Sequence, residues 1–313
     1  MAAPHDATHV PDMPVAPAMP RAIEVASTDD VRLAAYDTRG EPGGEALGGD
    51  PEVLLAHANG FCAAVYAPLV QALGDHRCVS YDARAHGHST RGSADMSWEG
   101  HRDDVLAVHD AMGMVHPVGV SHSMGGAALL LAEQLRPGTF SALWLFEPIV
   151  FPGEFTEGSG GSGENPMEQA ALRRRSHFES REDAFANFAG KPPMSELCHE
   201  CLAAYVTYGF HPAPDDGSDG GFVLACSPED EAAGYRMGSR HRAWQHLSEV
   251  TCPVVVLRGN DAVPTAATLA PLIASELPDG RVEAHDELGH FGPLENPGAM
   301  ARSVLDLIAS LPE

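Results

Sequence analysis

The sequence predicts an α/β fold in which a mostly parallel sheet of eight strands is flanked by helices and carries an inserted helical cap. Three observations support this prediction. Short apolar segments alternate with amphipathic segments up to residue 146 and again from residue 254, which is typical of a parallel sheet covered on both faces. Between these two parts the alternation is lost, as expected for an insertion. With 313 residues, 44% of them hydrophobic, the chain can bury one large core and a lid.

The elements follow from the residue pattern. The expected strands are Ala22–Ser27, Val31–Asp37, Val53–Ala58, Cys78–Asp82, Val118–Ser121, Leu143–Phe146, Val254–Arg258 and Arg281–His285. The expected helices of the core are Val65–Leu73, Trp98–Met112, Met124–Leu135, Ala266–Glu276 and Pro297–Ser310. Those of the cap are Glu168–Arg175, Arg181–Phe188 and Ser195–Tyr208.

Four segments result from this pattern. Residues 1–21 are proline-rich and read as a disordered tail. Residues 22–148 form the first part of the core, residues 149–247 form the helical cap, and residues 248–313 complete the core.

The chain is strongly acidic, with 19 Lys and Arg against 44 Asp and Glu and a formal net charge of −25. Such a charge repels nucleic-acid phosphates and anionic membrane surfaces, so neither is an expected partner. No apolar run approaches the roughly 18–20 residues that cross a bilayer, and the N-terminus lacks the pattern of a signal peptide. We therefore expect a cytoplasmic protein that acts on a small molecule.

Six cysteines are scattered along the chain. Cys198 and Cys201 have the CxxC spacing found in metal and redox sites, but no second pair completes a zinc site. We expect this pair to serve ordinary helix packing. No disulfide, metal or organic cofactor is expected.

The segment Gly119–Gly126 carries the strongest indication of chemistry, because it lies between an apolar strand and an Ala- and Leu-rich helix. A nucleophilic serine must be exposed on a sharp strand-to-helix turn that tolerates only small residues two positions on either side. Ser121 and Gly125 are those neighbours of Ser123. The turn also places Ser123 at a helix N-terminus, where unpaired N–H groups can stabilise a developing oxyanion.

With this motif, residues 22–313 resemble the α/β-hydrolase family. The segment 57–61, His-Ala-Asn-Gly-Phe, is similar to the oxyanion loop of the family, and 82–89, Asp-Ala-Arg-Ala-His-Gly-His-Ser, to its loop after the fourth strand. Ala58 and Ala85 stand where glycine is common. The resemblance implies that the backbone N–H groups of Asn59 and Met124 form the oxyanion hole, with Phe61 as the alternative to Asn59.

The resemblance also supplies a base and an acid. His290, in Gly-His-Phe before the last helix, matches the general base of the family. Asp261, in the loop after the seventh strand, matches the acid that orients the base, although only Asn260 separates it from Gly259 where two residues are usual. Glu147, at the end of the sixth strand, is the rival acid.

The expected function is a serine hydrolase that cleaves an ester or lactone through an acyl-enzyme. Carbon–carbon bond hydrolases, amidases and cofactor-free haloperoxidases or perhydrolases share the same triad, and the residues do not separate them. A serine at the turn argues against dehalogenases and epoxide hydrolases, which use a carboxylate there. A non-catalytic ligand-binding member of the fold is the alternative from another class.

Overall fold

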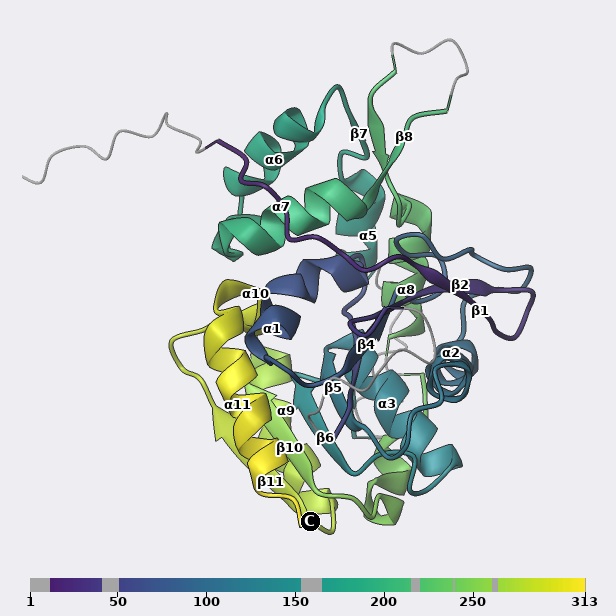
Figure 1. Ribbon diagram of the computed structural model, residues 1–313, viewed down its shortest axis with the longest axis vertical. Coiled ribbons are helices and arrows are strands. Elements are labelled where there is room, and N and C mark those ends of the chain that lie inside the picture. The colour runs from purple at the N-terminus through teal and green to yellow at the C-terminus, as the bar shows by residue number, and fades with distance from the viewer. Residues whose placement is uncertain are drawn as a thin grey trace, which may run out of the picture.

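A computed structural model describes residues 12–40, 51–152, 165–214, 220–238, 240–260 and 264–312, with the side chains of 264–267 excepted (Figure 1). Asp261 therefore lies outside the described residues. Within these ranges no helix is both long and apolar enough to cross a membrane.

The central sheet has eight strands, as the sequence predicts. In spatial order they are β1 (Ile23–Ala26), β2 (Arg32–Asp37), β4 (Cys78–Tyr81), β3 (Val53–Ala56), β5 (Val118–His122), β6 (Ala142–Phe146), β10 (Val254–Arg258) and β11 (Gly280–Ala284). β2 pairs antiparallel with β1 and with β4, and from β4 to β11 all pairs are parallel. The carboxyl ends of β3, β5, β6 and β10 therefore meet at one edge, which is where open α/β sheets bind ligands.

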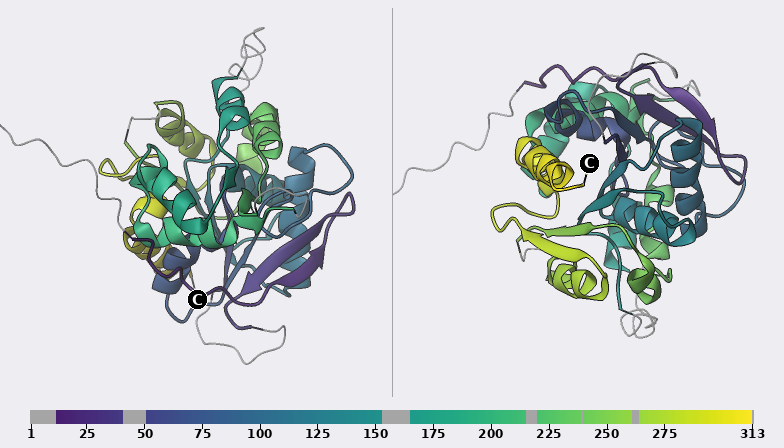
Figure 2. Two further views of the ribbon diagram at one scale, coloured as in Figure 1. Left: turned by 90° about the horizontal axis from the view of Figure 1, so that it is seen from above. Right: turned by 60° about the horizontal axis from the view of Figure 1, so that its bottom comes forward.

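Successive side chains of the inner strands point to opposite faces, and each face has its own core cluster. In β3, Leu54 packs in the cluster that includes α2 (Trp98–Ala111), α3 (Met124–Leu135) and α9 (Pro264–Glu276). Val53 and Leu55 pack on the other face with α1 (Ala67–Ala72) and α11 (Pro297–Ala309). The right view of Figure 2 shows α11, in yellow, on the opposite side of the molecule from the blue helices α2 and α3. Burial on both faces explains why these strands are continuously apolar in sequence.

The cap differs from the expected helical insertion in its strands. The described elements are α5 (Pro166–Arg173), β7 (His177–Phe178), α6 (Arg181–Ala189), a short 3-10 helix (Met194–Glu196), α7 (His199–Tyr208), β8 (Phe210–Pro212), β9 (Phe222–Leu224), α8 (Pro228–Met237) and a second 3-10 helix (Trp244–Glu249). The three strands form an antiparallel sheet in the order β7-β9-β8. They are two or three residues long, too short to show an alternating pattern.

Part of the expected disordered tail lies against the folded domain. Residues 12–22 contain no helix or strand, but Met13 and Ala16 pack against the apolar cluster that includes α7. The Tyr208 hydroxyl donates a hydrogen bond to the Pro17 carbonyl at 3.2 Å. Figure 1 shows this purple segment running beside α7. Residues 13, 16 and 17 of the expected tail are thus in contact with the folded domain, while residues 1–11 lie outside the described part.

The CxxC pair is located at the start of α7. The Cys198 sulfur caps this helix by accepting the Cys201 N–H at 3.4 Å, and Cys201 is fully buried. All six cysteines are free thiols. Across the described residues no group of His, Cys, Asp and Glu is arranged to hold a metal ion. In the described structure, Cys198 caps helix α7 and Cys201 packs in its buried face.

Candidate active site

Ser123 lies at the sharp turn between β5 and α3, as the sequence predicts. Its backbone has φ 54° and ψ −112°, a conformation that a residue with a side chain rarely adopts. Its N–H is bonded to the Phe146 carbonyl at 2.9 Å, which ties the turn to β6. A Cβ on Gly125 would lie 2.3 Å from the Ala56 carbonyl oxygen, so only glycine fits there. The close approach of Gly125 to β3 explains why the sequence has a glycine two residues after the serine.

His290 is paired with Glu147, the rival acid of the sequence analysis. The Nδ1 atom of His290 lies 2.5 Å from Oε2 of Glu147, whose residue is 1% exposed. The other carboxylate oxygen accepts the Gly259 N–H at 2.8 Å. Both oxygens are thus engaged, and the ring is held with Nδ1–H donating to the carboxylate. Glu147 itself has φ 44°, a second strained position at the sheet edge.

The imidazole of His290 is next to the serine turn. Its ring centroid is 4.9 Å from that of His122, the residue before Ser123. Within the described part of the chain the Ser123 hydroxyl has no hydrogen bond to the ring. Such catalytic hydrogen bonds often close only in the substrate complex.

The loop after β3 leaves one backbone donor free in the position that the resemblance implies. The Phe61 N–H is bonded to the Ala58 carbonyl at 3.3 Å, and the Gly60 N–H to Nε2 of His86 at 3.0 Å. The Asn59 N–H has no acceptor among the described residues. Met124 is the first residue of α3, where helix geometry leaves the N–H unpaired. The backbone geometry therefore favours Asn59 over Phe61 as the partner of Met124.

Two neutral histidines that the sequence analysis did not single out as site residues hold this loop. His57 donates from Nδ1 to the Ala58 carbonyl at 2.7 Å and accepts the Ala83 N–H on Nε2 at 2.9 Å. His86 donates from Nδ1 to the Arg84 carbonyl at 2.8 Å, while its Nε2 accepts the Gly60 N–H. Burial lowers the pKa of each to about 4, with the neighbouring His57 contributing at His86. A proton on either Nε2 would remove a loop contact.

His122 is a further buried histidine beside the site. Its Nδ1 is 2.8 Å from the Tyr66 hydroxyl, which also accepts the Ala58 N–H at 3.3 Å. Burial, and then the adjacent His290, holds the pKa of His122 well below its usual value. The ring therefore packs against His290 as a neutral group. The sequence contains 17 histidines, and only tertiary contacts separate these supporting groups from surface ones.

The aromatic residues of the cap mainly pack against one another. Phe178, Phe188, Tyr205 and Phe210 form a set of tilted and edge-to-face pairs, with ring centroids 5.5–6.2 Å apart. Tyr205 also contacts Phe61, at 5.4 Å. The cluster thus joins the cap to the loop after β3.

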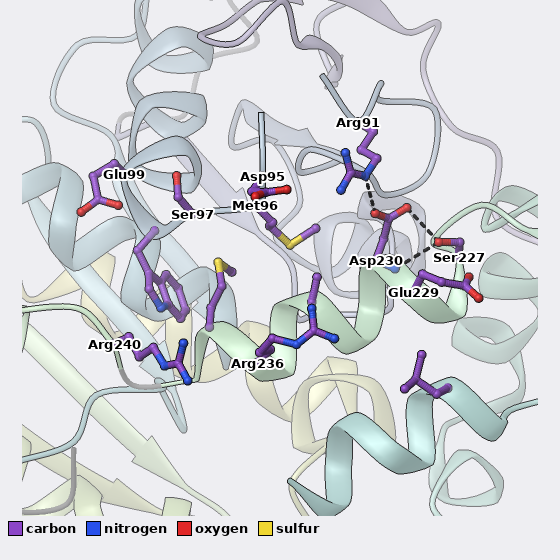
Figure 3. A pocket seen from close by; sticks show the side chains of 14 residues that line it. Arg91, Asp95, Met96, Ser97, Glu99, Ser227, Glu229, Asp230, Arg236 and Arg240 are labelled. Carbon is purple, nitrogen blue, oxygen red and sulfur yellow. Dashed lines mark hydrogen bonds and ion pairs between the residues drawn. The ribbon is translucent and has the colours of Figure 1, made fainter. Parts of the chain in front are cut away.

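A pocket of about 720 Å³ lies between α8 and the start of α2 (Figure 3). Trp98 and Met237 are among the residues that line it, and two further lining residues, Arg91 and Asp230, form an ion pair at 2.8 Å. The residues that line it do not include Ser123, Glu147 or His290.

Comparison with known proteins agrees with this fold. The model of the alpha/beta hydrolase family matches residues 53–303, and the chain belongs to this family. A curated relative is the abhydrolase domain-containing protein ACTT2 of Alternaria alternata, 27% identical over 222 residues that cover 61% of this chain and 82% of the relative.

Two solved structures are similar in fold. E-2-(acetamidomethylene)succinate hydrolase has a TM-score of 0.74 and 20% identity, covering 93% of this chain and all of its own. The enol-lactonase of Burkholderia xenovorans LB400 has a TM-score of 0.64 and 18% identity, covering 92% of this chain and all of its own.

Proposed function

We propose that the protein is a serine hydrolase that cleaves an ester or lactone, with Ser123 as nucleophile, His290 as general base and Glu147 as the orienting acid. The observation that carries the proposal is the contact of 2.5 Å between His290 and the buried Glu147, next to a serine in the strained turn. A paired carboxylate fixes the imidazole tautomer whose Nε2 can accept a proton. The proposal replaces Asp261 with Glu147, for which a direct contact exists.

The reaction follows from the roles of these groups. Nε2 of His290 takes the hydroxyl proton as the Ser123 oxygen attacks the carbonyl carbon, and the carboxylate of Glu147 stabilises the imidazolium. The N–H groups of Asn59 and Met124 bind the oxyanion, each donor accelerating the step by about 100- to 1000-fold. The imidazolium then protonates the departing alcohol. A water molecule, deprotonated by His290, hydrolyses the acyl-enzyme.

The names of the similar structures support the hydrolytic class and leave the substrate open. One is a hydrolase of a substituted succinate, and another an enol-lactonase. An ester, a lactone or an amide-like bond would each use the same oxyanion hole. We place esters and lactones first because an alkoxide leaves more readily than an amine.

A fluorophosphonate probe tests the proposal directly. We expect covalent labelling of Ser123, located by mass spectrometry, and none in Ser123→Ala. On p-nitrophenyl acetate and a series of lactones of graded size, Ser123→Ala should lose about 1000-fold or more in turnover. Labelling at another residue, or retained activity in the variant, would refute the assignment. A folded wild-type protein that resists the probe would instead be the ligand-binding member of the fold.

A further inference from the structure

The side chain of Asn59 is held by the cap helix α8. Its Nδ2 donates to the Glu231 carbonyl at 3.0 Å. Three residues further along the same face of the helix, a Cβ on Gly234 would lie 2.4 Å from Oδ1 of Asn59. The amide therefore fits into a notch that exists only because position 234 has no side chain.

The contact is reciprocal, with a glycine on each side. A Cβ on Gly60 would lie 2.8 Å from Oε1 of Glu231, so the loop also has no side chain where the helix projects one. The Glu231 carboxylate is fixed in turn by an ion pair with Arg174, which donates to the Tyr205 hydroxyl at 2.8 Å. Glu231 is buried, so this part of the cap cannot shift without breaking polar contacts away from water.

We propose that α8 positions the oxyanion donor, with Gly234 and Glu231 acting through the side chain of Asn59. This inference rests on the proposed function, in which the Asn59 N–H binds the oxyanion. In the core, Nε2 of His86 accepts the Gly60 N–H and lies 3.3 Å from Oδ1 of Asn59, and in the cap the Glu231 carbonyl accepts a hydrogen bond from Nδ2 of Asn59. Because both supports are needed to fix the direction of one N–H, displacement of α8 disorganises the hole without moving Ser123 or His290.

Gly234→Ala is the decisive variant. Alanine favours the helix over glycine, so the fold is retained, but its methyl group displaces the Asn59 amide. We expect kcat on p-nitrophenyl acetate to fall by about 10- to 100-fold, because the effect cannot exceed the complete loss of one oxyanion donor. KM should change by less than about threefold. Affinity for butylboronic acid, whose tetrahedral adduct occupies the hole, should fall by a similar factor. An unchanged kcat in the folded variant overturns the inference.

Matched variants separate positioning from general damage. Gly298→Ala is the control, because Gly298 is also a helical glycine and a Cβ there would have its nearest neighbours at 3.9 Å. This variant should leave kcat unchanged. Asn59→Ala keeps the backbone donor but removes the anchor, so it should also lose kcat. Adding Gly234→Ala to it should cost little more, since the clash needs the Asn59 side chain. Full kcat in Asn59→Ala, or an equal loss from Gly234→Ala in that background, would contradict the inference.

The same series distinguishes failure of the two proposals. If the wild-type protein is not labelled by a fluorophosphonate at Ser123, the proposed function fails. If Ser123 is labelled and turns over ester, but Gly234→Ala binds the boronic acid as the wild type does, only the positioning role fails.

Discussion

Replacing Glu147 with glutamine tests the acid of the proposed triad with the smallest change of shape. One carboxylate oxygen becomes an NH2 group, and the negative charge is lost. The two oxygens have different partners, since one is 2.5 Å from Nδ1 of His290 and the other accepts the Gly259 N–H at 2.8 Å. The glutamine amide can satisfy only one of these two donors.

Each orientation of the amide has a defined consequence. If its oxygen faces Gly259, its NH2 group faces His290, and the ring must carry its proton on Nε2, where it cannot accept one from Ser123. If its oxygen faces His290, the NH2 group meets the Gly259 N–H, leaving buried donors unpaired at a cost of about 1–3 kcal/mol. That cost alone reduces the competent form by about 5- to 150-fold. Loss of the charge that stabilises the imidazolium raises the total toward about four orders of magnitude in kcat.

The assay is kcat on p-nitrophenyl acetate, with thermal melting to show that the variant is folded. Asp261→Asn is the matched control, and we expect it to retain most of its activity. The fluorophosphonate rate should follow the same ranking, because it reports activation of the serine. A near-normal kcat in Glu147→Gln together with a kcat about four orders of magnitude lower in Asp261→Asn would refute the reasoning. It would instead assign the acid to Asp261, in the loop after β10.

Three further predictions follow from the structure. His290→Ala should lose about 1000-fold or more in kcat, and combining it with Ser123→Ala should cost little more, whereas additive losses would argue against a shared proton transfer. Burial lowers the pKa of His57 and His86 to about 4. As the pH falls below about 6.5, the unfolded chain therefore takes up protons on these histidines before the folded chain does, and the free energy of unfolding decreases toward pH 4. Each histidine lowers the free energy of unfolding by about 2 kcal/mol at pH 5, and Asp82, whose buried carboxyl has a raised pKa, partly offsets this loss. Urea unfolding at pH 7, 6 and 5 measures the effect, and a free energy of unfolding that does not change with pH would contradict it. Deleting residues 1–21 removes the bond from Tyr208 to Pro17 and the packing of Met13, and should lower Tm by about 3–6 °C relative to deleting residues 1–11; equal melting temperatures would contradict this.

Local patterns in the sequence predict the inner strands of the central sheet because β3, β4, β5, β6 and β10 are buried on both faces. The helix Met124–Leu135 has the same bounds in sequence and structure, since the small residues at its start and the apolar run behind them mark both ends. The cap is harder to predict. Helix α8 is not among the expected helices, although Ser227 caps it, Pro228 is its first residue and three acidic residues follow, which is typical of a helix start. The contact with Asn59 that explains Gly234 in its interior is a tertiary one.

The contacts of residues 12–21 with the folded domain were not predicted, for a related reason. Proline-rich segments with scattered apolar residues have no helical or strand period, and composition therefore assigns them to disorder. Pro17 is bonded to Tyr208 in α7, 191 residues away in sequence, and Met13 and Ala16 pack against the cluster that includes α7. No local signal in residues 12–21 indicates that surface.

The acid was ambiguous in sequence because the topology places both candidate segments at the same point of the sheet. β6 pairs in parallel with β5 on one side and with β10 on the other, with Phe146 opposite both His122 and Leu257. Ser123 and Glu147 are thus the first residues beyond adjacent strand ends. The loop from Gly259 follows β10 at the next position. Glu147, the proposed acid, has one oxygen next to Nδ1 of His290 while the other accepts the Gly259 N–H, so the loop after β10 binds the carboxylate that the end of β6 supplies.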